Sequence, residues 1–344
     1  MSAQMPLIPE GMPAIALALT LLLTLLLTLL LTTSHGIAQS HSVYPAVYPN
    51  KPLRWISPYA AGGGTDLTTR LVAQRISEVM GQTIVVDNRV GASGNIGAEI
   101  TARAPADGYT VGTITASHPA NNALADKLAY DLVHDFAYVT QMTSQPYILV
   151  VHPTLKVNSV KELVAQAAAQ PRTLHYGTAG IGTLQHFAGA MLASMNRIEV
   201  VHIPYKGGAP ATADFLGGRL QFFFGVPVSS LALIKSGRMR ALAVTSLKRS
   251  ALLPELPAVA ESGMPGYAVD NWYAIAAPAK TPRDVVMRLH GFALRALALP
   301  ELRERLRQDG ADTVGNSPEA LTALVKEDSL RWRKQARDAG IKAE

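Results

Sequence analysis

Three consecutive glycines, Gly62–Gly64, join the end of an expected strand at 54–57 to a helical pattern that begins at Asp66. Apolar residues continue this pattern at helical spacing to about residue 80. Thr65 and Asp66 are candidates for the N-cap of the helix. A glycine turn at a helix start presents several backbone N–H groups and the positive end of the helix dipole. The turn is therefore either an anion site or a tight connection with a capping Asp and no ligand.

The anion is not expected to be a nucleotide, because the turn lacks the Lys of a P-loop and the chain contains no G-x-G-x-x-G. The formal net charge is +6, but the basic residues are scattered. Two denser groups, at 303–307 and 331–337, fall on helical patterns with interspersed acids and indicate solvated helix faces. We therefore expect no nucleic-acid partner.

The first 38 residues differ in composition from the rest of the chain. Residues 14–31 form an apolar run broken only by threonines, and the small residues Gly36 and Ala38 follow it, as before a signal-peptide cleavage site. No Lys or Arg precedes the run, which is nearly long enough to span a bilayer, so an uncleaved anchor is the alternative. Either reading places the remainder outside the cytoplasm.

Cysteine is absent, which excludes disulfides, thiolate metal sites, a Cys nucleophile and a lipid-modified Cys. The nine histidines show no metal-ligand spacing. There is also no G-x-S-x-G nucleophile elbow and no HExxH zinc motif. We expect a binding protein with no metal and no cofactor, and keep an exported α/β hydrolase-like enzyme as the alternative.

Alternating strand and helix patterns predict an α/β fold with parallel sheets. We expect strands at 53–57, 83–86, 109–115, 138–143, 147–152, 174–176, 200–204, 220–224, 241–245 and 272–277. We expect helices at 66–80, 95–104, 160–170, 184–195, 211–217, 228–235, 282–298, 300–309 and 318–339, and a polar loop at 117–122.

A second glycine turn, at 177–183, feeds a helix in the second half of the chain. Ligands of open α/β sheets bind at the carboxyl ends of the strands, so two lobes facing each other place this turn opposite residues 60–66. Crossings between lobes near 141–148 and 267–277 form a hinge. The pattern predicts a two-lobed binding protein of the Venus-flytrap type.

Seven segments, in this order, carry a family resemblance: ISPYAAGGGTDLTTR, VVDNRVGASGNIGAE, ADGYTVGT, YGTAGIGTLQHFAG, HIPYKGGAPATADFLGGRLQ, IKSGRMRALAVTS and LPELPAVAESG. From about residue 48 onward, the chain resembles the Bug-type extracytoplasmic receptors of tripartite tricarboxylate transporters. The resemblance implies a periplasmic monomer that binds a small organic acid and presents it to two membrane permease subunits. The expected parts are a signal segment 1–38, a first lobe of 41–143 plus 270–344, and a second lobe of 144–269.

The resemblance also implies two carboxylate-binding loops, Pro58–Asp66 and Thr178–His186. Ile181 stands where the family often has Asn, which leaves the ligand's shape open. We expect the following residues to bind the ligand: Tyr59, Ala61, Gly62, Gly63, Gly64, Thr65, Asp66, Asn95, Ser117, Thr178, Ala179, Gly180, Thr183, His186, Lys206 and Gly207.

Several of these residues have a structural alternative. Asp66 caps its helix and orients the loop amides, or pairs with a ligand amine. His186 is a neutral hydrogen-bonding group at the cleft or a buried structural one. As alternatives to ligand binding, Asn95 caps a helix, Lys206 is a solvated surface residue and Tyr59 is a packing residue. The ligand remains open among mono-, di- and tricarboxylates, amino acids and aromatic acids, and a sensor role remains the alternative to transport.

Overall fold

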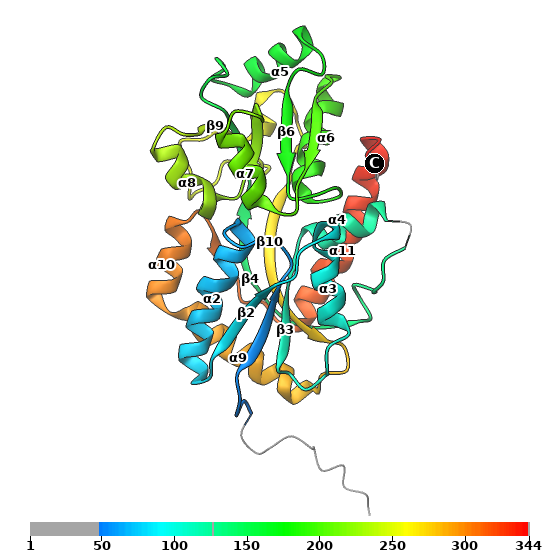
Figure 1. The fold of residues 1–344 in the computed structure, drawn as a ribbon, viewed down its shortest axis with the longest axis vertical. Helices are drawn as coiled ribbons and strands as arrows, with labels where there is room; N and C mark the ends of the chain where they lie inside the picture. The colour runs from blue at the N-terminus through cyan, green and yellow to red at the C-terminus, as the bar shows by residue number, and fades with distance from the viewer. Residues whose placement is uncertain (1–47, 126, 343–344) are drawn as a thin grey trace, which may run out of the picture. The chain divides into compact units, whose positions relative to one another are not determined.

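The computed structural model describes residues 48–125 and 127–342, which form two sheets with helices packed around them (Figure 1). The predicted signal segment or anchor at 1–38 lies outside these residues. Within the two described ranges, no helix is both long and apolar enough to cross a membrane.

The first sheet has the strand order β11-β4-β10-β3-β1-β2. Its strands are β1 (Leu53–Ser57), β2 (Ile84–Asn88), β3 (Thr110–Thr115), β4 (Phe136–Pro146), β10 (Asp270–Pro278) and β11 (Asp312–Thr313). β1 pairs in parallel with both β2 and β3, as the β-α-β-α-β pattern predicts. β10 pairs antiparallel with β3 and β4, so the sheet is mixed and not wholly parallel.

The second sheet has the order β7-β6-β8-β5-β9. Its strands are β5 (Ile148–Val151), β6 (His175–Thr178), β7 (Val201–Pro204), β8 (Phe222–Gly225) and β9 (Arg240–Val244). β6 pairs in parallel with β7 and β8, while β5 is antiparallel to its neighbours. Every residue of β5 and β8 is buried, which matches their continuous apolar sequences.

The helices are α2 (Gly64–Met80), α3 (Asn95–Ala102), α4 (Ser117–Leu124), α5 (Val160–Ala169), α6 (Leu184–Asn196), α7 (Gly208–Leu216), α8 (Pro227–Lys235), α9 (Arg283–Ala298), α10 (Pro300–Gln308) and α11 (Pro318–Asp338), with 3-10 turns at Ala92–Gly94 and Val259–Ser262. Figure 1 shows α2 and α9 on one side of the first sheet and α3 and α11 on the other. α2 and α3 lie on opposite faces because they connect the parallel strands β1, β2 and β3 in the order β3-β1-β2.

Two local predictions are wrong. α2 begins at Gly64 with Gly63 as its N-cap, so Thr65 and Asp66 lie in the first turn instead of capping it. Residues 117–122, predicted as a loop, belong to helix α4. Pro119 does not prevent this helix, because a first-turn proline lacks only an N–H that has no partner within the helix.

The chain crosses from the first sheet to the second between Pro146 and Ile148, and returns between Val244 and Asp270. The fold is thus a two-lobed α/β structure, as predicted, in which β4 and β10 lie side by side where the chain changes lobes. The carboxyl ends of β1, β3 and β6 each lead into a helix start (Figure 1). The space these helix starts surround is where a ligand is expected.

Candidate functional site

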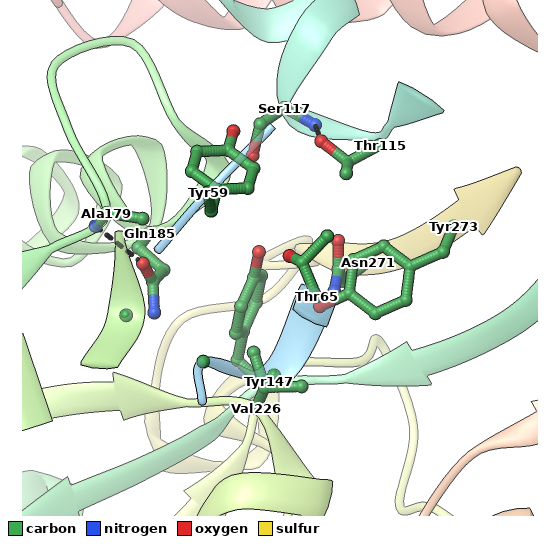
Figure 2. Close-up of a pocket in the computed structure, with 13 residues that line it drawn as sticks. Tyr59, Thr65, Thr115, Ser117, Tyr147, Ala179, Gln185, Val226, Asn271 and Tyr273 are labelled. Atoms are coloured by element: carbon green, nitrogen blue, oxygen red, sulfur yellow. Dashed lines mark hydrogen bonds between the residues drawn. The ribbon is translucent and has the colours of Figure 1, made fainter. Parts of the chain in front are cut away.

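A small cavity, with about 30 Å³ of space open to a water-sized molecule, lies where these helix starts meet (Figure 2). Residues from both lobes form its walls. The lining residues are Tyr59, Gly63, Gly64, Thr65, Thr115, Ser117, Tyr147, Ala179, Gln185, Gly208, Val226, Asn271 and Tyr273.

Several helices begin at this cavity. Gly64 and Ser117 are the first residues of α2 and α4, and Gly208 is the first residue of α7. Gln185 lies in the first turn of α6, and Val226 is the N-cap of α8. The first-turn amides of a helix have no partner within it, and the helix dipole places partial positive charge there. Five helix starts around one cavity therefore favour an anion.

No Asp, Glu, Lys, Arg or His is among the lining residues. Basic side chains therefore contribute nothing to the wall, and partial positive charge there is supplied by backbone amides and helix dipoles. A carboxylate accepts charge-assisted hydrogen bonds from such amides without needing a basic side chain.

Three tyrosine rings add hydroxyl groups to the walls. Burial raises the pKa of Tyr59 to about 12, against the opposing effect of Thr115 and Ser117 beside its hydroxyl. Burial likewise raises the pKa of Tyr147 and of Tyr273. All three phenols are therefore protonated at neutral pH. Tyr59 donates its proton to the Ser93 carbonyl oxygen at 2.9 Å, while Tyr147 extends into the middle of the site (Figure 2).

Asp66 does not line the cavity; it holds the first glycine turn from behind. Its buried carboxylate accepts hydrogen bonds from the Gly62 N–H at 2.9 Å, from Asn88 Nδ2 at 2.8 Å and from Arg70 Nε at 3.0 Å. Burial acts to raise its pKa, but these hydrogen bonds and the Arg70 charge bring the pKa below its usual value. The expected role of orienting the loop amides fits this geometry, and all its contacts here are within its own lobe.

The second glycine turn is held mainly by its own side chains. Gln185 accepts a hydrogen bond from the Ala179 N–H at 2.8 Å and donates one to the Phe224 carbonyl oxygen at 2.6 Å. Thr183 donates to the Gly180 carbonyl oxygen at 2.7 Å. Thr178 bonds to a ring nitrogen of His202 at 2.7 Å. These polar groups shape the turn, leaving Ala179 and Gln185 as its contribution to the cavity wall.

His186 faces away from the cavity. Its Nδ1 accepts a hydrogen bond from the Gly182 N–H at 3.1 Å, and its ring stacks on His202 with centroids 4.2 Å apart. Burial lowers its pKa to about 4. The ring is therefore neutral at pH 7, as expected, but it stands behind the turn and not at the cleft.

The structure brings six of the expected ligand-binding residues to the cavity wall: Tyr59, Gly63, Gly64, Thr65, Ser117 and Ala179. It places the other ten outside the lining: Ala61, Gly62, Asp66, Asn95, Thr178, Gly180, Thr183, His186, Lys206 and Gly207. Asn95 accepts a hydrogen bond from the Tyr130 hydroxyl at 2.6 Å. Lys206 is exposed, and the Gly207 backbone packs against Ala60.

Sequence reasoning missed seven residues of the wall: Thr115, Tyr147, Gln185, Gly208, Val226, Asn271 and Tyr273. Thr115 ends β3, and Tyr147 lies at the first lobe crossing. Asn271 and Tyr273 lie on β10, just after the second crossing. Three of these residues, Tyr147, Asn271 and Tyr273, could have been predicted from the sequence, because polar and aromatic residues at the predicted lobe crossings face the space between the lobes.

The lobes touch directly beside the cavity. The Leu184 N–H donates to Ser117 Oγ at 3.1 Å, which joins the starts of α6 and α4. A Cβ added at Gly64 would lie 2.5 Å from the Cβ of Val226, so the start of α2 approaches α8 as closely as a glycine permits. No cluster of three or more potential metal-binding side chains occurs within residues 48–125 and 127–342.

A two-lobed α/β fold with an uncharged cavity ringed by helix starts defines the class of extracytoplasmic solute receptors. Residues 68–341 match the tripartite tricarboxylate transporter family receptor. The chain belongs to this family, whose Bug-type members it resembles in sequence, and is accordingly a binding receptor and not an enzyme.

The chain is 32% identical over 297 residues to Protein BugT of Bordetella pertussis, covering 86% of this chain and 91% of BugT. It is similar to the solved periplasmic binding protein BugD, with 34% identity, a TM-score of 0.83 and coverage of 86% and 100% of the two chains. It is equally similar to Rpa4515 of R. palustris, solved with adipate, with 36% identity, a TM-score of 0.83 and coverage of 86% and 99%.

Proposed function

We propose that this chain is a periplasmic receptor that captures a small organic carboxylate in the cavity between its lobes and delivers it to a tripartite permease with two membrane subunits. The observation that carries the proposal is the cavity itself: it has no charged side chain, and five helix starts surround it. Such a wall offers many N–H donors and no cation, which suits an anion bound through backbone amides. The adipate found in Rpa4515 is an anion of this kind.

Of the predicted ligand-binding residues, we propose that Gly64 and Thr65 supply amides from the first turn of α2, with the N-cap Gly63 beside them. We propose that Ser117 and Ala179 supply contacts from the two sides of the cleft. We propose a supporting role for Asp66 and His186, which hold the Gly62 and Gly182 amides in place. We also propose lobe boundaries of 41–143 plus 270–344 and 144–269, with residues 1–38 as a signal peptide or an uncleaved anchor.

Binding is tested by melting-temperature shifts of the purified, exported protein with a panel of mono-, di- and tricarboxylates and their uncharged methyl esters. A ligand that binds only the folded state raises the apparent stability. We expect a shift from acids and none from esters, and we expect Gly63→Val to abolish it, since a side chain there meets the backbone of Ala209 across the cleft at 3.3 Å. The absence of a shift from every acid, or conversion of the acid into product, contradicts the proposal.

Delivery is tested separately, in cells. A strain without the chain is expected to lose uptake of the acid that shifts the melting temperature, and the wild-type gene is expected to restore it. Unchanged uptake alongside a lost transcriptional response to the acid assigns the receptor to a sensor role instead.

A further inference from the structure

Two neighbouring strands at the lobe crossing bring a pair of amide side chains together beside the cavity. Asn271 of β10 lies directly opposite Gln145 of β4 in the antiparallel ladder, so both side chains project from the same face. The two residues are 1% and 3% exposed. Neither Asn271 Nδ2 nor Asn271 Oδ1 has a hydrogen-bond partner among the described residues, and Gln145 Oε1 has none there either.

The nearest hydroxyl cannot satisfy both carbonyls. Tyr273 follows Asn271 by two residues, and its hydroxyl lies close to Asn271, Gln145 and Thr65. A phenol has one proton to donate, whereas Asn271 and Gln145 present two carbonyl oxygens. This hydroxyl therefore cannot satisfy both oxygens, and neither Asn271 Oδ1 nor Gln145 Oε1 has a donor among the described residues. Leaving such a buried group unpaired destabilises the protein.

Asn271 is the member of this pair that lines the cavity, next to Thr65 and Tyr273 (Figure 2). A plain carboxylate fits its amide only in part, because carboxylate oxygens accept hydrogen bonds from Nδ2 but repel Oδ1. A ligand hydroxyl both donates and accepts, so one hydroxyl satisfies Oδ1 and Nδ2 together.

An ammonium group would also donate to these carbonyls, but the cavity does not suit it. No carboxylate side chain lines the wall. Asp66, the buried acid of the adjacent turn, is already bonded to Arg70, Asn88 and the Gly62 N–H. A desolvated cation without a protein counter-charge is costly, whereas a hydroxyl is not.

From the unpaired amide on the cavity wall, we propose that Asn271 recognises a hydroxyl on the ligand and that the substrate class is hydroxy-substituted carboxylates. The inference rests on the proposed function, since it assigns a substrate class to the same cavity. Asn271 acts as a specificity-determining residue, and the helix starts hold the carboxylate.

The test compares acids of equal length with and without a hydroxyl, by calorimetric titration: malate against succinate, and 2-hydroxyadipate against adipate. Aspartate supplies the ammonium at the position of the malate hydroxyl. We expect the wild-type protein to bind the better hydroxy acid at least tenfold more tightly than its unsubstituted counterpart, because a site built around a ligand hydroxyl rejects the analogue that lacks it.

Asn271→Leu has a similar volume and no polar group, so it is expected to remove this preference while still binding the unsubstituted acid. Asn271→Ala is the second variant, with the same expectation, in case the leucine prevents folding. Asn158→Leu, at an exposed asparagine outside the cavity lining, is the matched control and is expected to keep the preference.

Each outcome bears on one proposal. Equal binding of both members of each pair by the wild-type protein, or a preference that survives in Asn271→Leu and Asn271→Ala, overturns the hydroxyl inference and leaves the carboxylate receptor standing. Tighter binding of aspartate than of malate overturns it in favour of an amino acid. Binding of no acid overturns the proposed function itself.

Discussion

The two glycine turns of this receptor look alike in sequence, yet they meet the cavity in different ways. The first turn places Gly63, Gly64 and Thr65, the start of α2, on the cavity wall. The second turn contributes Ala179 and Gln185 to the wall, while its hydroxyls and its histidine bond within their own lobe. Backbone groups of the first turn therefore face the cavity, whereas side chains of the second turn form hydrogen bonds within their own lobe and fix the shape of that turn.

This difference teaches that a polar residue in a ligand-binding loop has two possible partners, the ligand or the loop. Asp66 and His186 both bond to the loop. Asp66 accepts a hydrogen bond from the Gly62 N–H, and His186 accepts one from the Gly182 N–H. The comparison therefore predicts different effects for the two turns. Substitutions in the second turn mainly reduce the stability of the protein, and substitutions in the first turn mainly reduce its affinity for the ligand.

The largest expected effect is that of Gln185→Ala in the second turn. The substitution leaves the Ala179 N–H and the Phe224 carbonyl oxygen without their partner inside the protein. Each unsatisfied buried group costs about 1–3 kcal/mol, so we expect the free energy of unfolding to fall by about 2–4 kcal/mol. Urea unfolding of the ligand-free protein measures this change.

The control for this variant is Gln74→Ala, at an exposed glutamine on α2 that bonds only to Glu78 among the described residues. A surface change of this kind is expected to alter stability by less than about 0.5 kcal/mol. If Gln185→Ala proves as stable as Gln74→Ala, then the second turn does not depend on this side chain. That result would contradict the proposed difference between the two turns.

A smaller effect, on affinity and not on stability, is expected from Gly64→Ala in the first turn. The new Cβ would lie 2.5 Å from the Cβ of Val226 in the other lobe, so the lobes cannot close to the same distance. Overpacking of this kind costs about 1–3 kcal/mol. We expect ligand affinity to fall roughly 10- to 100-fold while the ligand-free protein keeps its melting temperature.

Gly291→Ala is the matched control, because Gly291 lies inside helix α9 and an added Cβ there meets nothing within 4 Å. It is expected to leave affinity unchanged and to stabilise the helix slightly. Unchanged affinity in Gly64→Ala would show that closure against Val226 is not needed for binding, and the first turn would lose its assigned role.

The order of strands and helices could be predicted from the sequence because hydrophobic periodicity and glycine turns report local structure directly. The two lobes and their facing glycine turns were also predicted from this pattern, and the resemblance added the receptor function and the two carboxylate-binding loops. The failure at 117–122 has a local cause: the segment SHPANN is polar and contains proline, but its proline falls in the first turn of α4, where it is tolerated.

The cavity wall could be predicted only in part, because side-chain direction is set by tertiary contacts. Nothing in the sequence around His186 indicates that its ring stacks on His202, which is sixteen residues away along the chain and lies on β7, the strand paired with β6. Asn271 lies on a strand whose partner β4 is far away in sequence, and its opposition to Gln145 depends on that register. Contacts of this kind become visible only when both lobes are assembled.

The last prediction concerns acid, and it separates the two turns by pH. Burial lowers the pKa of His186 to about 4, below the unfolded value of about 6.5. The unfolded chain therefore binds the proton first, so the contribution of His186 to stability is complete above about pH 6.5 and is lost as pH falls toward 4. Asp66 behaves differently, because its pKa lies below 3.8 and its contribution is lost only below that pH.

Urea unfolding between pH 7 and pH 4.5 tests this difference, since Asp66 stays ionised throughout that range. His118 and His202 also have pKa values lowered by burial, to about 4 and about 3, so the wild-type slope contains their contributions too. The informative comparison is therefore with His186→Asn, whose amide oxygen preserves an acceptor for the Gly182 N–H. We expect a shallower loss of stability in His186→Asn and an unchanged slope in Asp66→Asn. Parallel curves for the wild type and His186→Asn would mean that the imidazole behind the second turn is already solvated, and that this turn is not the acid-sensitive one.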